Sequence, residues 1–89
     1  MRSKHKSLMR LTRIYYLQKD FARAAASAET AVKFFQQQWG NPFGEGLFWQ
    51  ALSTFRAGNP ARARQIAGTL QDHCSNYPQL DALLKTIGK

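Results

Sequence analysis

The chain has 89 residues, a net charge of +8 and a single cysteine, with 44% hydrophobic and 20% charged residues. This length corresponds to one small domain and the composition is ordinary for a globular protein, which excludes a multidomain enzyme and a disordered chain. One cysteine cannot form an internal disulfide or a thiolate metal cage. Packing alone is therefore expected to hold the fold, in a reducing and hence cytoplasmic environment.

The positive charge is concentrated in the first 13 residues, which contain no acid. The bases there are Arg2, Lys4, Lys6, Arg10 and Arg13, whereas the rest of the chain is close to balanced. Such a segment favours acidic proteins, nucleic acid or anionic lipid as partners.

Arginines interrupt the apolar region that a signal peptide needs, and no segment has the roughly 18 apolar residues that span a bilayer. A soluble protein is expected, with a mitochondrial presequence as the alternative for this basic start.

Residues 7 to 18 are expected to form the first helix. Leu8, Leu11 and Tyr15 recur there at helical spacing, while the bases follow another stripe. Asp20 then stands as an N-cap, whose carboxylate can accept hydrogen bonds from the first free amides of a second helix.

The second helix is predicted over FARAAASAETAVKFFQQQ, which directly follows that cap. Glu29 and Lys33 are four positions apart on it and form a favourably oriented ion pair. The other side is a face of small residues and one aromatic: Ala24, Ala28, Ala31 and Phe35.

Residues 39 to 46, WGNPFGEG, contain three glycines and a proline, so the chain is expected to turn there. Trp39 and Phe43 are large aromatics in this loop. They are expected to fold back on the core, with contact to a partner as the alternative. A third helix follows, with apolar residues at helical spacing: Phe48, Ala51, Leu52 and Phe55.

Gly58, Asn59 and Pro60 supply in order a helix stop, an N-cap and a first-turn residue that needs no N–H. The fourth helix follows at once, and its apolar face consists of Ala63, Ile66, Ala67, Leu70 and Cys74. Pro78 is expected to open a fifth helix, which carries Leu80, Leu83, Leu84 and Ile87. The pattern predicts an all-α fold with five helices and no strand.

The two halves of the chain repeat each other, and the two caps Asp20 and Asn59 are 39 residues apart. Aromatic residues precede the caps by four positions, at Tyr16 and Phe55. Four, eight and eleven positions after the caps come Ala24, Ala28 and Ala31 in the first copy, and Ala63, Ala67 and Leu70 in the second. Small residues therefore recur where two helices must pack closely.

This pattern resembles the tetratricopeptide repeat, a helical hairpin with a small residue midway in its first helix and an aromatic toward the end of that helix. A Gly-Asp/Asn turn and alanines at these spacings in the second helix complete the family's pattern. The resemblance covers about residues 5 to 75, with YYLQKDFARAAASAETAV and FWQALSTFRAGNPARARQIAGTL as the matching segments.

The chain departs from that pattern in several places. Lys19 replaces the turn glycine of the first copy, Gln50 stands where a leucine is usual, and Leu70 stands where an alanine is usual. The expected prolines are displaced to Pro42 and Pro78, and the period exceeds the family's length of about 34 residues. A generic antiparallel helical bundle is the alternative fold.

The resemblance implies a single helical-repeat domain. A flexible basic start at residues 1 to 5 precedes one hairpin at 6 to 38, a loop at 39 to 46, a second hairpin at 47 to 75 and a capping helix at 78 to 87. Since roughly three repeats are needed for independent stability, self-association or a protein partner is expected to cover the open side of the first helix.

The resemblance also implies a partner-binding groove along the first helix of each hairpin. Apolar and aromatic residues line its middle and bases its edges, which suits an amphipathic helix with acidic flanks. No asparagine is present among the groove residues, so the clamp that some family members use for a C-terminal carboxylate is not expected. Ordinary helix packing is the alternative role for the aromatics. The groove residues are Lys6, Met9, Arg13, Tyr16, Leu17, Phe48, Leu52, Phe55 and Arg56.

No catalytic residue, metal site or cofactor is expected. His5 lies in the expected flexible start, and His73 has no acid or nucleophile spaced to serve it. His73 and Cys74 are adjacent on a helix, so their side chains diverge by about 100° and cannot chelate one ion. The glycines of the loop lack the Gly-Lys-Ser/Thr ending of a phosphate-binding loop.

The preferred function is therefore a small protein-binding module, an adaptor or chaperone for a helical segment of another protein. Small tetratricopeptide-like chaperones that hold needle subunits of bacterial type III secretion are similar in size and in the block WQALSTFRAG. The alternative is nucleic-acid binding, in which Lys6, Arg10 and Arg13 make unspecific phosphate contacts. The client protein is not specified by these residues.

Overall fold

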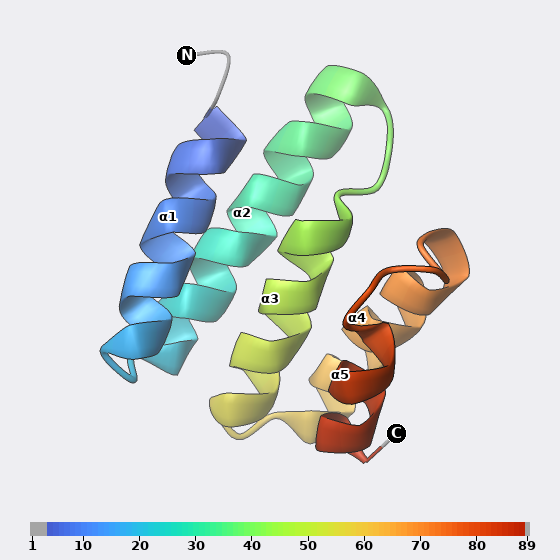
Figure 1. Cartoon of the computed structure of the whole chain (residues 1–89). Coiled ribbons are helices and arrows are strands. Elements are labelled where there is room, and N and C mark those ends of the chain that lie inside the picture. The colour runs from blue at the N-terminus through green and yellow to red at the C-terminus, as the bar shows by residue number, and fades with distance from the viewer. Residues whose placement is uncertain (1–3, 89) are drawn as a thin grey trace.

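The computed structural model describes residues 4–88, which form five α-helices and no strand. The all-α fold is thereby confirmed for this range. The helices are α1 (Lys4–Leu17), α2 (Phe21–Trp39), α3 (Gly44–Arg56), α4 (Pro60–His73) and α5 (Leu80–Ile87). Figure 1 shows α1, α2 and α3 side by side, with α4 and α5 beyond α3. We call α1 and α2 hairpin one, and α3 and α4 hairpin two.

Both predicted N-caps are present. A side-chain oxygen of Asp20 accepts a hydrogen bond from the Arg23 N–H at 3.4 Å, and Asn59 accepts one from the Arg62 N–H at 3.2 Å. The predicted ion pair of Glu29 with Lys33 is also formed, at 3.5 Å.

The turns of the two hairpins share one backbone geometry. Lys19 has φ of 63° and Gly58 has φ of 97°, so the lysine adopts the left-handed conformation of its glycine counterpart. The Lys19 N–H donates to the Tyr16 carbonyl at 3.0 Å, and the Gly58 N–H donates to the Phe55 carbonyl at 3.0 Å. The 39-residue repeat therefore extends to the hydrogen bonds of the turns.

The start of the chain differs from the sequence-based expectation. Lys4 and His5 belong to α1 and not to a flexible segment, while residues 1–3, including Arg2, lie outside the described residues. The helix extends this far because the His5 ring packs edge-on against an aromatic cluster at the end of hairpin one. Its ring centroid lies 5.1 to 5.3 Å from those of Phe35, Trp39 and Phe43.

The loop between the hairpins is shorter than the predicted 39 to 46, because α2 includes Trp39 and α3 begins at Gly44. Gly40, with φ of 73°, ends α2 and donates its N–H to the Gln36 carbonyl. Gly46 lies inside α3, where a Cβ atom would come within 2.7 Å of Val32 Cγ2. This glycine therefore permits a close approach of α3 to α2 and does not mark a turn.

The two loop aromatics have different surroundings. Phe43 folds back as expected, and its ring stacks on Phe35 with a centroid distance of 4.5 Å and an interplanar angle of 9°. Trp39 also contacts Phe35, at 4.8 Å, but its residue remains 47% exposed. The expectation of folding back therefore holds fully for Phe43 and only in part for Trp39.

The fifth helix also begins later than expected, at Leu80 and not at Pro78. The preceding residues form a turn, in which the Leu80 N–H donates to the Tyr77 carbonyl at 3.1 Å. α5 packs against α4 and also reaches α3. It therefore closes the side of hairpin two that faces away from hairpin one.

Small residues fill the repeated helix contacts. The alanines predicted at equivalent positions of α2 and α4 have at most 1% of their surface exposed, and Leu70 is fully buried. The main cluster of buried apolar residues belongs entirely to α3, α4 and α5, and it includes Phe48, Leu70 and Leu83. Large side chains thus pack hairpin two, whereas alanines dominate the interior of hairpin one.

The first helix does not bury its predicted apolar face. Met9 and Thr12 are the buried residues of α1, at 2% and 0% exposure, and the Thr12 hydroxyl donates to the Leu8 carbonyl at 2.9 Å. Leu11 is 41% exposed, and Leu8 and Tyr15 are half-buried. The reason is that α2 and α3 cover only one side of α1, and the leucine stripe lies at the edge of that side.

Candidate protein-binding groove

The predicted groove residues lie on α1 and α3, and two polar contacts join these helices. Arg13 Nη1 lies 3.4 Å from Glu45 Oε2, with both side chains 47% exposed. Arg56 Nε donates a hydrogen bond to the Tyr16 hydroxyl at 3.1 Å. The Tyr16 ring also packs edge-on against Trp49, with centroids 5.4 Å apart. The first helices of the two hairpins therefore form one continuous surface.

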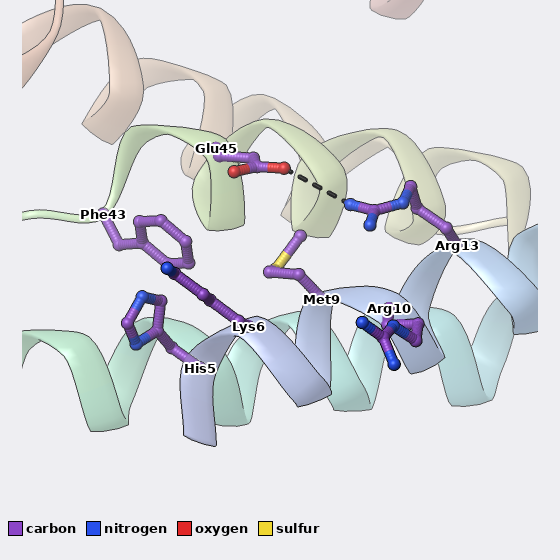
Figure 2. Close-up of a pocket in the computed structure, with 7 residues that line it drawn as sticks. All are labelled: His5, Lys6, Met9, Arg10, Arg13, Phe43 and Glu45. Carbon is purple, nitrogen blue, oxygen red and sulfur yellow. Dashed lines mark hydrogen bonds and ion pairs between the residues drawn. The ribbon is translucent and has the colours of Figure 1, made fainter. Parts of the chain in front are cut away.

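The first part of this surface is a basic cavity of about 360 Å³. Met9 lies between α1 and α3 in Figure 2, with His5, Lys6 and Phe43 gathered on one side of it. Arg10, Arg13 and Glu45 complete the lining. Because Glu45 is the only acid in this lining and already pairs with Arg13, the cavity retains an excess of positive charge. It can accept a carboxylate or another anionic group.

The second part is an aromatic cavity of about 290 Å³. Four predicted groove residues line it from hairpin one and α3: Tyr16, Phe48, Leu52 and Arg56. Its remaining wall comes from the C-terminal part of the chain, with Gln79, Ala82, Leu83 and Thr86. The mixed apolar and hydroxyl-bearing lining can hold apolar side chains with a few hydrogen bonds at the edges.

The contribution of α5 was missed in the sequence-based prediction. Gln79, Ala82 and Thr86 recur at positions i, i+3 and i+7, which is a second helical face beside the apolar one. That spacing indicates a surface of α5, but it does not say which neighbouring helix the surface meets. The contact of α5 with α3 decides this.

Some predicted residues are only loosely part of the groove. Phe48 is 9% exposed and packs against Trp49 and Tyr77, with centroids 5.8 and 5.6 Å apart, so most of its surface is in the core. Phe55 is half-buried and packs on the same core, without lining either cavity. Leu17 is 82% exposed and lines neither cavity.

Tyr77 is a further residue of interest near the aromatic cavity, because its ring packs on Phe48. Burial raises the pKa of the Tyr77 hydroxyl, and the negative charges of Glu45 and, to a lesser degree, Cys74 raise it further. The neutral phenol is therefore the form that the fold favours.

Residues 4–88 contain no group of three or more His, Cys, Asp or Glu side chains able to hold a metal ion. No helix in this range is long and apolar enough to cross a membrane.

Comparison with models of known families, with curated proteins and with solved structures finds no match to this chain. The likeness to tetratricopeptide repeats therefore depends on the residues and geometry of the chain itself.

Proposed function

We propose that the protein is a small tetratricopeptide-like binding module that holds a helical segment of another protein, as an adaptor or chaperone. The observation that carries this proposal is the pair of neighbouring cavities, one basic and one aromatic, along α1 and α3. Arg13 lines the first cavity and Tyr16, one turn later on α1, lines the second. A single ligand can therefore occupy both.

The two cavities specify the chemistry of the bound helix. Lys6 and Arg10 are exposed bases in the first cavity, and they suit acidic side chains at one end of the ligand. Leu52 and Ala82 suit apolar side chains in the second cavity. The ligand is thus an amphipathic helix whose acidic residues lie toward the N-terminal end of α1.

The test uses an exposed position, so that folding is not disturbed. Ala82→Glu places a charge in the aromatic cavity, and Ala61→Glu adds the same charge on an exposed site of α4 that lines no cavity described above. The partner is isolated with the native chain, identified by mass spectrometry and titrated against both variants. Ala82→Glu should weaken binding by about tenfold or more, because a charge would be desolvated in an apolar contact.

The Ala61→Glu variant should bind like the native chain. If Ala82→Glu also binds like the native chain while remaining folded, the aromatic cavity is not the binding site and the proposal is wrong.

Nucleic-acid binding is a second candidate, favoured by one observation. Lys4, Lys6 and Arg10 are exposed on α1, a helix that contains no acid. Such binding would weaken steeply with salt, roughly in proportion to the number of phosphates contacted. It would be indifferent to the nucleotide sequence, and Ala82→Glu would affect it only weakly.

A further inference from the structure

The side of α1 that faces away from hairpin two is bare and apolar. Leu11 is 41% exposed and Ile14 is 42% exposed, and both are among the large hydrophobic residues that the described structure leaves on the surface. Ser7 lies one turn before Leu11 on the same side and is also exposed. We call Ser7, Leu11 and Ile14 the N-terminal flank.

In hairpin two, the face of α3 that corresponds to the N-terminal flank is covered. A shift of 39 residues takes Ser7, Leu11 and Ile14 to Gly46, Gln50 and Ser53. Gln50 is 6% exposed and Ser53 is fully buried, and Gly46 lies so close to α2 that a Cβ atom would be 2.7 Å from Val32 Cγ2. α2 therefore packs on α3 where nothing among the described residues packs on α1.

The cavities beside these two faces also correspond. A cavity of about 280 Å³ lies beside the N-terminal flank, and one of about 220 Å³ lies beside its counterpart in hairpin two. Shifted by 39 residues, six of the seven residues that line the first fall on residues that line the second. Glu29, Val32 and Lys33 of α2 form the remaining wall of the second cavity. The first cavity has no such wall within the described structure.

We infer that the N-terminal flank docks a second helix from a partner protein, and that this helix presents a face like that of α2. Hairpin two shows what such a helix must offer: a branched apolar residue in the place of Val32 and an acid in the place of Glu29. The flank suits it better than α3 does, since Leu11 and Ile14 stand where α3 has Gln50 and Ser53.

Charge favours a partner protein over a second copy of this chain. α1 carries Lys4, Lys6, Arg10 and Arg13 without an acid, so pairing two copies through α1 brings like charges together. The corresponding acid of the partner helix would lie near Arg23, because its counterpart Arg62 lines the second cavity together with Glu29. An amphipathic helix with an acid on its docking face, as Glu29 provides on α2, is therefore the occupant that the flank selects.

The N-terminal flank and the groove are centred on different sides of α1 and meet at Arg10. Leu11 and Arg13 are two positions apart on α1, which places them about 200° apart around the helix. Arg10 lines the basic cavity and lies one turn before Ile14. The inference depends on Leu11 and Ile14 and not on the cavities of the groove, so it can fail separately from the proposed function.

The experiment uses a peptide with the sequence of residues 21–39, because α2 already has the required face. The intact chain is labelled with ¹³C at leucine and isoleucine methyl groups and titrated with this peptide to about 1 mM, which detects interactions of about −4 kcal/mol. Saturable shifts are expected at Leu11 and Ile14. A peptide carrying Val32→Glu should bind about tenfold more weakly or worse, and this control cannot unfold the chain.

Two variants of the chain complete the test. Leu11→Glu should abolish the shifts at Ile14, whereas Ala61→Glu adds the same charge at an exposed residue of α4 that does not line the cavity beside the flank, and it should leave the shifts unchanged. The inference is overturned if no shift occurs at Leu11 and Ile14, or if the shifts spread through α3 because the peptide exchanges with α2. It is also overturned if sedimentation of the free chain shows a dimer that Leu11→Glu dissociates.

Discussion

Hairpin one and hairpin two share a turn geometry but differ in what fills and covers them. Hairpin two contains the large buried side chains and is covered by α2 on one side and α5 on the other. Hairpin one is packed mainly with alanines, and the outer side of α1 is bare. Because local stability follows buried apolar contact, hairpin two should be the more stable half and hairpin one the less stable half. Both proposed binding surfaces involve α1, which belongs to hairpin one.

The largest difference between the hairpins should appear at Leu70 and Ala31, which are 39 residues apart and both fully buried. Leu70→Ala should lower the free energy of unfolding by about 3 to 5 kcal/mol, because it leaves a cavity in the main core. Ala31→Gly removes only one methyl group and should cost about 1 kcal/mol, mostly through helix propensity. Urea denaturation measures both. Equal losses of stability in the two variants would contradict the difference in packing between the hairpins.

A smaller effect is expected where α2 meets α3. Gly46→Ala would place a methyl group 2.7 Å from Val32 Cγ2 and from the Phe43 ring, so neighbouring side chains must shift. The variant should lose about 1 to 2 kcal/mol of stability, since overpacking outweighs the gain in helix propensity. Ser7→Ala, the counterpart on the bare side of α1, should be close to neutral. A stabilised Gly46→Ala variant would mean that α2 and α3 are less closely packed.

Because the two hairpins share a turn geometry, substitutions at the equivalent turn positions should change stability in opposite directions. Lys19 and Gly58 both have positive φ, a conformation that costs a residue with a Cβ atom about 1 kcal/mol. Lys19→Gly should therefore stabilise the chain by up to about 1 kcal/mol, and Gly58→Ala should destabilise it by about the same amount. Nothing lies within 4 Å of a Cβ at Gly58, so the cost there is conformational and not steric. Thermal unfolding of the two variants should move the midpoint in opposite directions.

The smallest expected effect concerns alkaline pH. The pKa of Tyr77 is raised in the folded chain by burial and by nearby negative charge, so the unfolded chain releases this proton first. Stability from this residue is complete below the ordinary tyrosine pKa of about 10 and is lost as pH rises through the higher pKa of the folded state. Tyr77→Phe should reduce the loss of stability above about pH 10, as measured by denaturation at each pH. If Tyr77→Phe leaves the pH dependence of stability unchanged, ionisation of Tyr77 does not affect the free energy of unfolding.

Local features of the fold were predictable from the sequence because they depend on neighbouring residues. The Asp20 and Asn59 caps, the Glu29–Lys33 pair and the buried alanines follow from spacing alone, and the structure confirms them. Features that depend on distant segments were not predictable. Periodicity identifies the stripe of Leu8 and Leu11, but it cannot say that α2 covers this stripe only in part.

Prediction of the candidate site was limited in the same way, because part of the site depends on distant segments. The sequence indicated groove residues on α1 and α3, and Lys6, Met9 and Arg13 do line one cavity. It did not indicate that His5 joins them, since an aromatic cluster that includes Phe35 holds this residue in α1. Nor could local spacing place α5 beside α3, because the turn after α4 sets that position.

The most direct test of the account is the ranking of two variants against the identified partner. Leu52 lines the aromatic cavity and is half-buried, whereas Phe48 belongs to the core and would unfold the chain if charged. We predict that Leu52→Glu, shown by circular dichroism to be folded, weakens binding by about 2 kcal/mol or more. Lys6→Ala should cost under about 1 kcal/mol and mainly slow association. A folded Leu52→Glu chain that keeps its partner, together with a Lys6→Ala chain that loses it, would contradict the groove and favour nucleic-acid binding.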